Sequence, residues 1–322
     1  MVSGTLDRYL QKGVALPLMY EKMEPYLQWG TWINSLPSDD QAFTYLYDST
    51  GKSSDSKKET PPKHTFPAKF PELDRSRKNV TSSVLQEQGF AIRIPRAIML
   101  STARGKAEIM DSFESAGFWM AEAINSSILA VLVGCSEGAS MVNNGVWSGA
   151  TATQVKDLIS LGKTMRREGY PFRFTDGFVG EDNWYELADA VTFYDSADYA
   201  TRERVFGTVD VSKDTIYIPA AKATIHLVMS GMTASSMLAL DRNNKGAELH
   251  YFNDPEYSTA TVSYMTTDAD TNGKPKSVTV PNMGIHFQKI YEEDTHDTLL
   301  QFWYNNKAVI TKQYGFYLGS GL

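Results

Sequence analysis

The sequence predicts an α+β fold in which helices and mostly antiparallel strands occupy different parts of the chain. A helical spacing of apolar residues covers 101–133, an amphipathic stretch covers 152–169, and strand-like runs fill the last third. Of the 322 residues, 42% are hydrophobic and 12% aromatic. This content is enough for a substantial core and excludes general disorder.

Composition excludes several functional classes. The net charge of -7 argues against a general nucleic-acid-binding protein, because such a chain repels a polyphosphate. The single cysteine, Cys135, forms no internal disulfide, and the five histidines lack zinc-ligand spacing. Asp7 and Arg8 lie where a secretory signal needs its apolar centre, and the stretch 124–133 is too short to cross a bilayer. We therefore expect a protein made in a cytoplasm, without membrane span, cofactor or structural metal.

Residues 1–42 form an N-terminal arm with apolar and aromatic anchors, among them Trp29 and Trp32, but without a sustained period. Such a segment has to bury these side chains on another surface. Two interpretations stay open. The arm is either a strap over the chain's own core, which the residues alone favour, or a segment laid across a neighbouring subunit.

Residues 43–95 indicate a long protruding hairpin. An aromatic strand begins at Phe43, the polar run DSTGKSSDSKKETPPK follows, and the chain returns through Phe90 and Ile92. Between 50 and 80 there are eight Lys or Arg residues and four acidic residues, which gives a local net charge of +4. A polar insertion of this length is uncommon inside a compact domain. It is either a solvated loop or a segment ordered by something outside the domain.

The segment 101–133 has the strongest helical pattern. Its apolar stripe recurs at three and four residues and comprises Met110, Phe113, Gly117, Met120, Ile124, Ile128 and Val131. A continuous helix over this span would be about 50 Å long. Gly134 can end it, whereas Gly105 and Gly117 each cost about 1 kcal/mol relative to alanine.

The rest of the chain predicts one more short helix, over 184–190, and a series of strands. The strands are expected over 205–211, 215–218, 224–229, 237–240, 247–252, 261–265, 277–280, 285–291, 298–304 and 308–310. Asn272-Gly273 and Asn305-Asn306 are predicted turns.

Two patterns resemble chemical sites, and neither assembles an active centre. The run from Gly134 to Gly138 fits G-x-S-x-G, the nucleophile elbow of serine hydrolases, with Ser136 as nucleophile. The turn-like residues 138–149 follow it where a helix is required, so a helix C-cap is the better interpretation. An acidic cluster could bind a hard cation, although such a run is more often a solvated turn: Glu292, Glu293, Asp294, His296 and Asp297. We expect no catalytic, cofactor-binding or metal-binding residues.

The order of these segments resembles the major capsid proteins of tailed double-stranded DNA viruses, a fold shared with encapsulins. The passages GFAIRIPRAIM, before the long helix, and WYELADA, after it, are similar to recurrent passages of that family. The resemblance implies the tailed-phage major capsid fold, with peripheral and axial domains. Its parts would be an N-terminal arm over 1–42, an extended loop over 43–95, a spine helix of the peripheral domain over 96–147, an axial domain over 148–257, and peripheral strands with the C-terminal tail over 258–322.

The resemblance also implies a structural, non-enzymatic function. The subunit would self-assemble through pentamers and hexamers into an icosahedral virion capsid around double-stranded DNA, without sequence-specific binding and without a membrane. Portal, scaffold and decoration proteins are further implied partners, although the chain has no room for the N-terminal scaffolding domain of many relatives. We expect inter-subunit contacts from the arm's Trp29 and Trp32, and between two sets of charged residues, Lys57, Lys58 and Lys63 of one copy and Glu292, Glu293 and Asp294 of its neighbour.

Three alternatives remain. Some relatives crosslink a loop lysine to a neighbour's asparagine; the matching asparagines here would be Asn282, Asn305 and Asn306. An encapsulin-type nanocompartment would use the same fold to enclose an enzyme. A serine hydrolase would use Ser136. In every shell-forming case, we expect the first ninety or so residues to be completed by adjacent copies.

Overall fold

The computed structural model describes most of the chain, in two compact units. The described residues are 10–27, 29, 32–48, 78–100, 102–135, 137–140, 154–167, 173–192, 207–211, 214–228, 232, 236–243, 245–269, 275–294, 296–312 and 316–320. Unit 1 comprises Met1–Thr44, Ser82–Ile128 and Glu248–Val309, and unit 2 comprises Tyr45–Thr81, Leu129–Ala247 and Ile310–Leu322. Each unit contains helices and a mostly antiparallel sheet, which confirms the predicted α+β class.

Unit 1 is built on a five-stranded sheet whose longest strand is β15 (Asp297–Ile310). β15 pairs antiparallel with β14 (Ile285–Glu292) on one side and with β4 (Gln86–Ile94) on the other. The remaining strands are β11 (Ala247–Tyr251) and β1 (Asn34–Pro37), which pair in parallel. Alternate β15 side chains such as Leu300 and Phe302 are buried, as a strand with one covered face requires.

Asn305 and Asn306 lie inside β15, so the turn predicted there is wrong. They are opposite Glu87 and Gln86 of β4. On the other side of the strand, the Asn305 N–H donates to the Gly284 carbonyl (2.8 Å). Gly284 has φ +78°, and a Cβ there would lie 2.3 Å from the Asn305 carbonyl oxygen. Because Gly284 has no side chain, its backbone can approach and hydrogen-bond to Asn305. These strand contacts outweigh the local preference of two consecutive asparagines for a turn.

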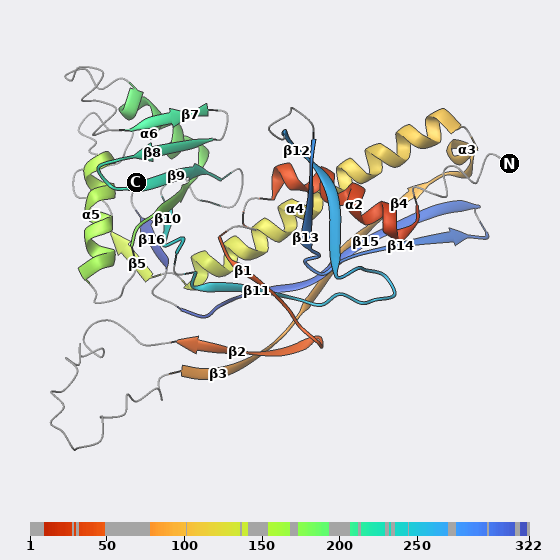
Figure 1. Ribbon diagram of the computed structural model, residues 1–322, viewed down its shortest axis with the longest axis horizontal. Coiled ribbons are helices and arrows are strands. Elements are labelled where there is room, and N and C mark those ends of the chain that lie inside the picture. Colours follow the sequence, from red (N-terminus) through yellow and green to blue (C-terminus); the bar gives the residue numbers. More distant parts are fainter. Residues whose placement is uncertain are drawn as a thin grey trace. The chain divides into compact units, whose positions relative to one another are not determined.

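The predicted long helix is confirmed as α4 (Thr102–Cys135), a single helix of 34 residues (Figure 1). Its fully buried Phe113 contacts Phe302 edge to face, with ring centroids 5.4 Å apart, and also Phe287 at 5.9 Å. By length and composition alone, α4 could cross a membrane. Packing accounts for its apolar stripe, because that stripe includes Phe113, Met120 and Ile124, which are buried within the protein.

The arm contains a helix that we did not predict, α2 (Lys12–Met23). It buries Ala15, Leu16, Met19, Tyr20 and Met23 and contacts β14 and β12 (Thr261–Ala269) of the same unit. The apolar residues of 1–42 show no sustained period, so no helix was predicted here; the helix forms although it contains Pro17. For this segment the structure therefore shows a strap over the chain's own core.

The helices α2 and α4 approach each other closely at Gly117. A Cβ at Gly117 would lie 2.9 Å from the Lys22 Cβ and 3.0 Å from the Met23 backbone nitrogen. A glycine inside a helix costs about 1 kcal/mol relative to alanine. Burial of the apolar face of α2 offsets this cost, because α2 can pack this closely only where α4 has no side chain.

A buried hydrogen-bond network joins α2 to the loop before β14. The Tyr20 hydroxyl donates to Asn282 Oδ1 (2.9 Å) and accepts from the Met283 N–H (2.8 Å). Asn282 Nδ2 donates to Ser258 Oγ (2.6 Å) and to the Ile285 carbonyl (2.9 Å). Burial raises the pKa of Tyr20 far above its usual range, so the hydroxyl stays protonated and keeps both bonds.

A second anchor holds the start of α2. The Lys12 ammonium donates to the carbonyls of Pro255 (2.6 Å) and Glu256 (3.1 Å).

A buried histidine holds the same loop. The Asp254 N–H donates to Nε2 of the fully buried His286 (2.9 Å). The His286 ring stacks on Trp303, with centroids 5.2 Å apart and planes at 9°. Burial lowers the pKa of His286, so the imidazole is neutral near pH 7.

Unit 1 also carries a two-stranded sheet of β12 and β13 (Pro275–Pro281), which are antiparallel (Figure 1). Tyr264 of β12 stacks on Tyr20 of α2, with ring centroids 6.0 Å apart. The arm helix therefore contacts this ribbon as well as the larger sheet.

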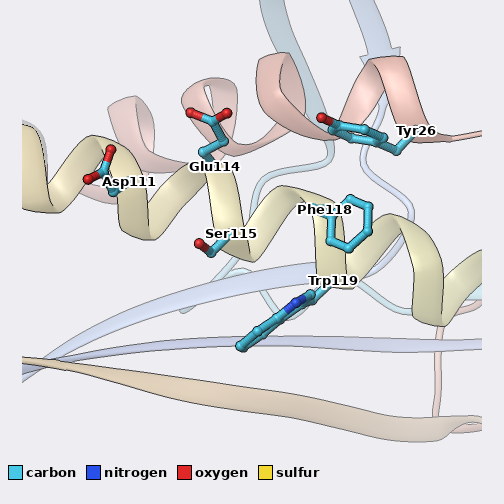
Figure 2. A pocket seen from close by; sticks show the side chains of 6 residues that line it. All are labelled: Tyr26, Asp111, Glu114, Ser115, Phe118 and Trp119. Carbon is cyan, nitrogen blue, oxygen red and sulfur yellow. The ribbon is translucent and has the colours of Figure 1, made fainter.

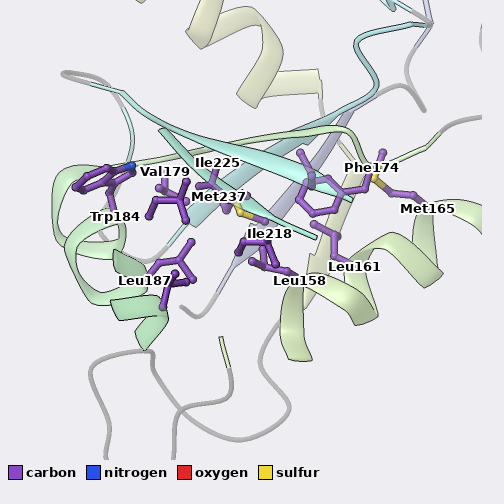
Figure 3. Close-up of a cluster of buried hydrophobic side chains, with 14 residues drawn as sticks. Leu158, Leu161, Met165, Phe174, Val179, Trp184, Leu187, Ile218, Ile225 and Met237 are labelled. Atoms are coloured by element: carbon purple, nitrogen blue, oxygen red, sulfur yellow. The ribbon is translucent and has the colours of Figure 1, made fainter. Parts of the chain in front are cut away.

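Unit 2 contains a seven-stranded mixed sheet in the order β5-β16-β10-β6-β9-β8-β7. Its strands are β5 (Glu137–Ser140), β6 (Asp176–Val179), β7 (Thr208–Asp210), β8 (Thr215–Ile218), β9 (Ala223–Leu227), β10 (Ser236–Leu240) and β16 (Phe316–Ser320). The helices α5 (Gln154–Arg167) and α6 (Glu181–Thr192) pack on this sheet. Figure 3 shows their apolar side chains, such as Leu158 and Leu187, meeting Ile225 and Met237 of the sheet.

A buried carboxylate ties strands β6 and β9 of unit 2 to the turn that follows β10. Asp176 of β6 accepts hydrogen bonds from both Arg242 Nη2 (2.6 Å) and Nε (3.2 Å), and its Oδ1 lies 3.0 Å from His226 Nε2 of β9. Burial would raise the pKa of Asp176, but its hydrogen bonds with His226, Arg242 and Thr175 outweigh burial and hold the pKa below its usual range.

We expect Gly117→Ala to destabilise the protein by about 1–3 kcal/mol, because the new methyl group overpacks the crossing of α2 and α4. The matched control is Gly162→Ala in α5, where a Cβ would lie 3.8 Å from the Phe174 Cβ, an ordinary contact. The control should gain up to about 1 kcal/mol from helix propensity. Urea unfolding measures both, and equal stabilisation by the two substitutions would contradict the close approach.

We expect Tyr20→Phe to cost about 1–3 kcal/mol, because it leaves the Met283 N–H and part of Asn282 without a partner in a buried site. Tyr185→Phe is the control, since Tyr185 is 55% exposed. Thermal unfolding gives the stability, and hydrogen exchange of the α2 amides locates the loss. Unchanged exchange in α2 would show that the network does not hold the arm.

We expect stability to fall with decreasing pH below about 6.5, the usual histidine pKa. The unfolded chain binds a proton at His286 in this range, whereas the folded chain, whose His286 pKa is lowered, does not. The free energy of unfolding at about pH 7.5 and 5.5 measures the loss. His286→Gln should make the loss smaller and His296→Gln, at an exposed position, should leave it unchanged. The same loss in all three proteins would contradict this assignment.

Candidate assembly surfaces

The hairpin predicted to protrude contains a separate two-stranded ribbon of β2 (Ala42–Asp48) and β3 (Lys78–Val84) (Figure 1). Leu46 of β2 and Val84 of β3 are 52% and 59% exposed. A two-stranded ribbon is marginally stable on its own, so a partner that covers its exposed aliphatic side chains would stabilise it. Lys57, Lys58 and Lys63 lie outside the described residues.

The base of the ribbon is fixed to unit 1. Phe43, buried, stacks on the His250 ring with centroids 4.1 Å apart and planes at 14°. His250 Nε2 lies 3.2 Å from Glu248 Oε2, and the Leu85 N–H donates to the Gln41 carbonyl (2.8 Å). The ribbon therefore begins at a rigid base.

Trp29 and Trp32 are buried in unit 1, with 0% and 9% of their surface exposed. In these positions the two indoles present little surface to a neighbouring subunit. We expected these residues at an interface because they are apolar. They are instead buried in the core of their own subunit.

The acidic residues predicted to face a neighbour lie at the turn between β14 and β15. Glu292 forms an ion pair with Arg93 of β4 within the same chain (3.0 Å). Glu293 and Asp294 are exposed. Among the described residues, no group of three or more His, Cys, Asp or Glu side chains could hold a metal ion. The turn therefore presents two exposed carboxylates beside an internal ion pair.

The three asparagines considered for crosslinking are buried in their own subunit. Asn282, Asn305 and Asn306 are 0%, 7% and 2% exposed. Asn282 uses both side-chain atoms in the network with Tyr20, Ser258 and Ile285. The three amide groups therefore present little or no surface for a crosslink in these positions.

The serine hydrolase alternative is contradicted by the order of elements around Ser136. A nucleophile elbow follows a strand and leads into a helix. Here helix α4 ends at Cys135 and strand β5 begins at Glu137, which is the reverse order. Ser136 itself lies outside the described residues.

A surface that we did not predict lies on α4 and on the short helix η1 (Glu24–Tyr26) of unit 1. It is an open hollow of about 400 Å³, lined by Tyr26, Asp111, Glu114, Ser115, Phe118 and Trp119 (Figure 2). We name it the acidic–aromatic hollow. Phe118 and Trp119 are adjacent aromatic residues off the apolar stripe of the helix, and this was the signal that could have revealed the surface.

No family model matches the chain, and no curated protein matches it. Solved structures do. The virus-like particle from Pyrococcus furiosus is 6% identical, with a TM-score of 0.54, over 94% of this chain and 96% of that one. A phage-related protein from Bordetella bronchiseptica is 12% identical, with a TM-score of 0.52, over 95% and 96%. The capsid protein of the native GTA particle is 9% identical, with a TM-score of 0.53, over 92% and 90%. The chain therefore has the tailed-phage major capsid fold.

Proposed function

We propose that the protein is a major capsid subunit that assembles through pentamers and hexamers into an icosahedral virion shell around double-stranded DNA. The observation that carries this proposal is the fold. It aligns over more than nine-tenths of both chains with a virus-like particle protein, and over 92% and 90% with the capsid protein of a particle computed with C5 symmetry. Portal and scaffold proteins would be its further partners.

The exposed β2–β3 ribbon supports assembly. Its aliphatic side chains Leu46 and Val84 are more than half exposed, although the base of the ribbon at Phe43 is buried. Covering such side chains contributes about 25 cal/mol for each Å² of apolar surface removed from water. A neighbouring copy that lies over the ribbon would supply this cover, and in a closed ring every copy both covers and is covered.

Charge supports a partner for the ribbon. The residues between 50 and 80 carry a net charge of +4, whereas the whole chain carries -7. Glu293 and Asp294 are exposed at the turn between β14 and β15. We propose that Lys57, Lys58 and Lys63 face this turn on a neighbour, a pairing that sets register and partner choice more than affinity.

Electron microscopy of the expressed full-length chain tests the proposed shell. Closed particles with nuclease-protected DNA inside support the capsid function. Closed particles that contain protein and no nucleic acid support the second candidate, an encapsulin-type compartment, which the similarity to a virus-like particle favours. A monomer at every concentration would contradict both.

We expect the Lys57→Glu, Lys58→Glu double variant to lose most particle formation, because it places like charges opposite each other. The fold should persist, with a change in unfolding free energy within about 0.5 kcal/mol. The matched control is Lys156→Glu, Lys163→Glu, which makes the same charge change at exposed positions of α5. Adding Glu293→Lys and Asp294→Lys should restore assembly. Equal assembly of variant and control would contradict the proposed pairing.

A further inference from the structure

We propose that the acidic–aromatic hollow binds a basic amphipathic peptide segment of a partner protein. The hollow lies entirely within unit 1 of one subunit, since Tyr26 and residues 111–119 all belong to it. Peptide binding therefore does not depend on shell formation. Peptide binding tests this proposal and particle formation tests the capsid function, so either one can fail without the other.

Exposed aromatic rings form the apolar part of the hollow. Phe118 is 40% exposed and Trp119 is 55% exposed, although the same helix buries its other large apolar side chains near them, such as Phe113 and Met120. Neighbouring large aromatic residues on a surface are typical of a binding site, because tryptophan and tyrosine provide much contact area at little cost in side-chain entropy.

The aromatic rings are held by their own subunit. Tyr26 meets Phe118 edge to face, with ring centroids 5.1 Å apart, and Trp119 meets Phe90 of β4 in the same way at 5.5 Å. The Tyr26 carbonyl also accepts a hydrogen bond from Asn125 Nδ2 (2.7 Å). A site that is already ordered loses little entropy when a ligand binds.

The polar part of the hollow is negative. Figure 2 shows the carboxylates of Asp111 and Glu114 projecting from α4, on the same helix as the rings of Phe118 and Trp119. Glu108 and Glu122 are exposed on the same helix, one turn before Asp111 and one turn after Phe118. Within the described residues, no cation forms an ion pair with Asp111 or Glu114.

This combination specifies the chemistry of the occupant. One lysine or arginine can pair with the carboxylates, and another can lie on the face of Trp119 as a cation. Apolar side chains of the same segment can cover Phe118 and Tyr26. A nucleic acid would meet carboxylates with its phosphates and be repelled. The volume of about 400 Å³ is at the small end for ligand sites and fits a few side chains of a short segment.

Fluorescence anisotropy with a labelled peptide tests the proposal on the full-length chain. The probe is a peptide of about 12 residues, with Lys and Leu at amphipathic helical spacing. A second peptide has Glu in place of every Lys. The protein variants are Glu114→Lys and Trp119→Ala, with Asp189→Lys as the control, because Asp189 is an exposed helical carboxylate in unit 2.

We expect saturable binding of the Lys/Leu peptide and no binding of the Glu/Leu peptide. Glu114→Lys and Trp119→Ala should each weaken the binding about tenfold, whereas Asp189→Lys should change it less than about twofold. The absence of binding, or equal binding of both peptides, would overturn the proposal. So would equal weakening by Glu114→Lys and Asp189→Lys, which would mean attraction to the net charge alone. Concentration-dependent dimers that Trp119→Ala abolishes would assign the hollow to a second copy and would also overturn it.

Discussion

The packing of α2 on α4 and the sheet of unit 1 is the interaction on which the rest of this unit depends. Gly117 lets the two helices approach, and the Tyr20–Asn282 network anchors the other face of α2 to the loop before β14. If α2 did not pack here, its side chains Leu16, Met19 and Met23 and the surfaces that they cover would be exposed to water. The arm is therefore part of the core of the subunit.

This arrangement divides the first ninety residues into two parts with different requirements. The arm buries apolar side chains such as Trp29 within its own subunit, and Tyr20 makes its hydrogen bonds there as well. The ribbon of β2 and β3 has a buried base at Phe43 but exposes Leu46 and Val84. Among the described residues, the ribbon is the part whose aliphatic side chains lack cover, so the proposed contact between neighbouring copies involves the ribbon and not the arm.

Elements with a regular period were predictable from the sequence, and elements fixed by tertiary contacts were not. The stripe through Phe113 and Met120 predicted α4, because it extends over many turns. The strands β8, β12 and β14 were predicted near their true bounds. α2 was missed because residues 1–42 show no sustained period; its stability comes from burial and not from propensity. β6 was missed because it is four residues long and starts with Asp176, whose buried charge is balanced by Arg242, an arginine distant in sequence.

The candidate surfaces were predicted less completely than the fold. A tryptophan in a sequence indicates apolar area but not which surface covers it, so Trp29 was expected at an interface and lies in the core. Trp119 was not singled out, although it lies off the helical stripe and is half exposed. The sequence alone does not show that Trp29 is buried and Trp119 exposed, because this depends on where α2 and η1 pack.

Hydrogen–deuterium exchange on assembled particles and on dissociated subunits tests the central claim most directly. We expect the amides of α2 to be equally protected in both states, because the arm is folded on its own subunit, and the amides of β2 and β3 to be protected only in particles. Loss of protection in α2 on dissociation, or full protection of the ribbon in the isolated subunit, would contradict this account.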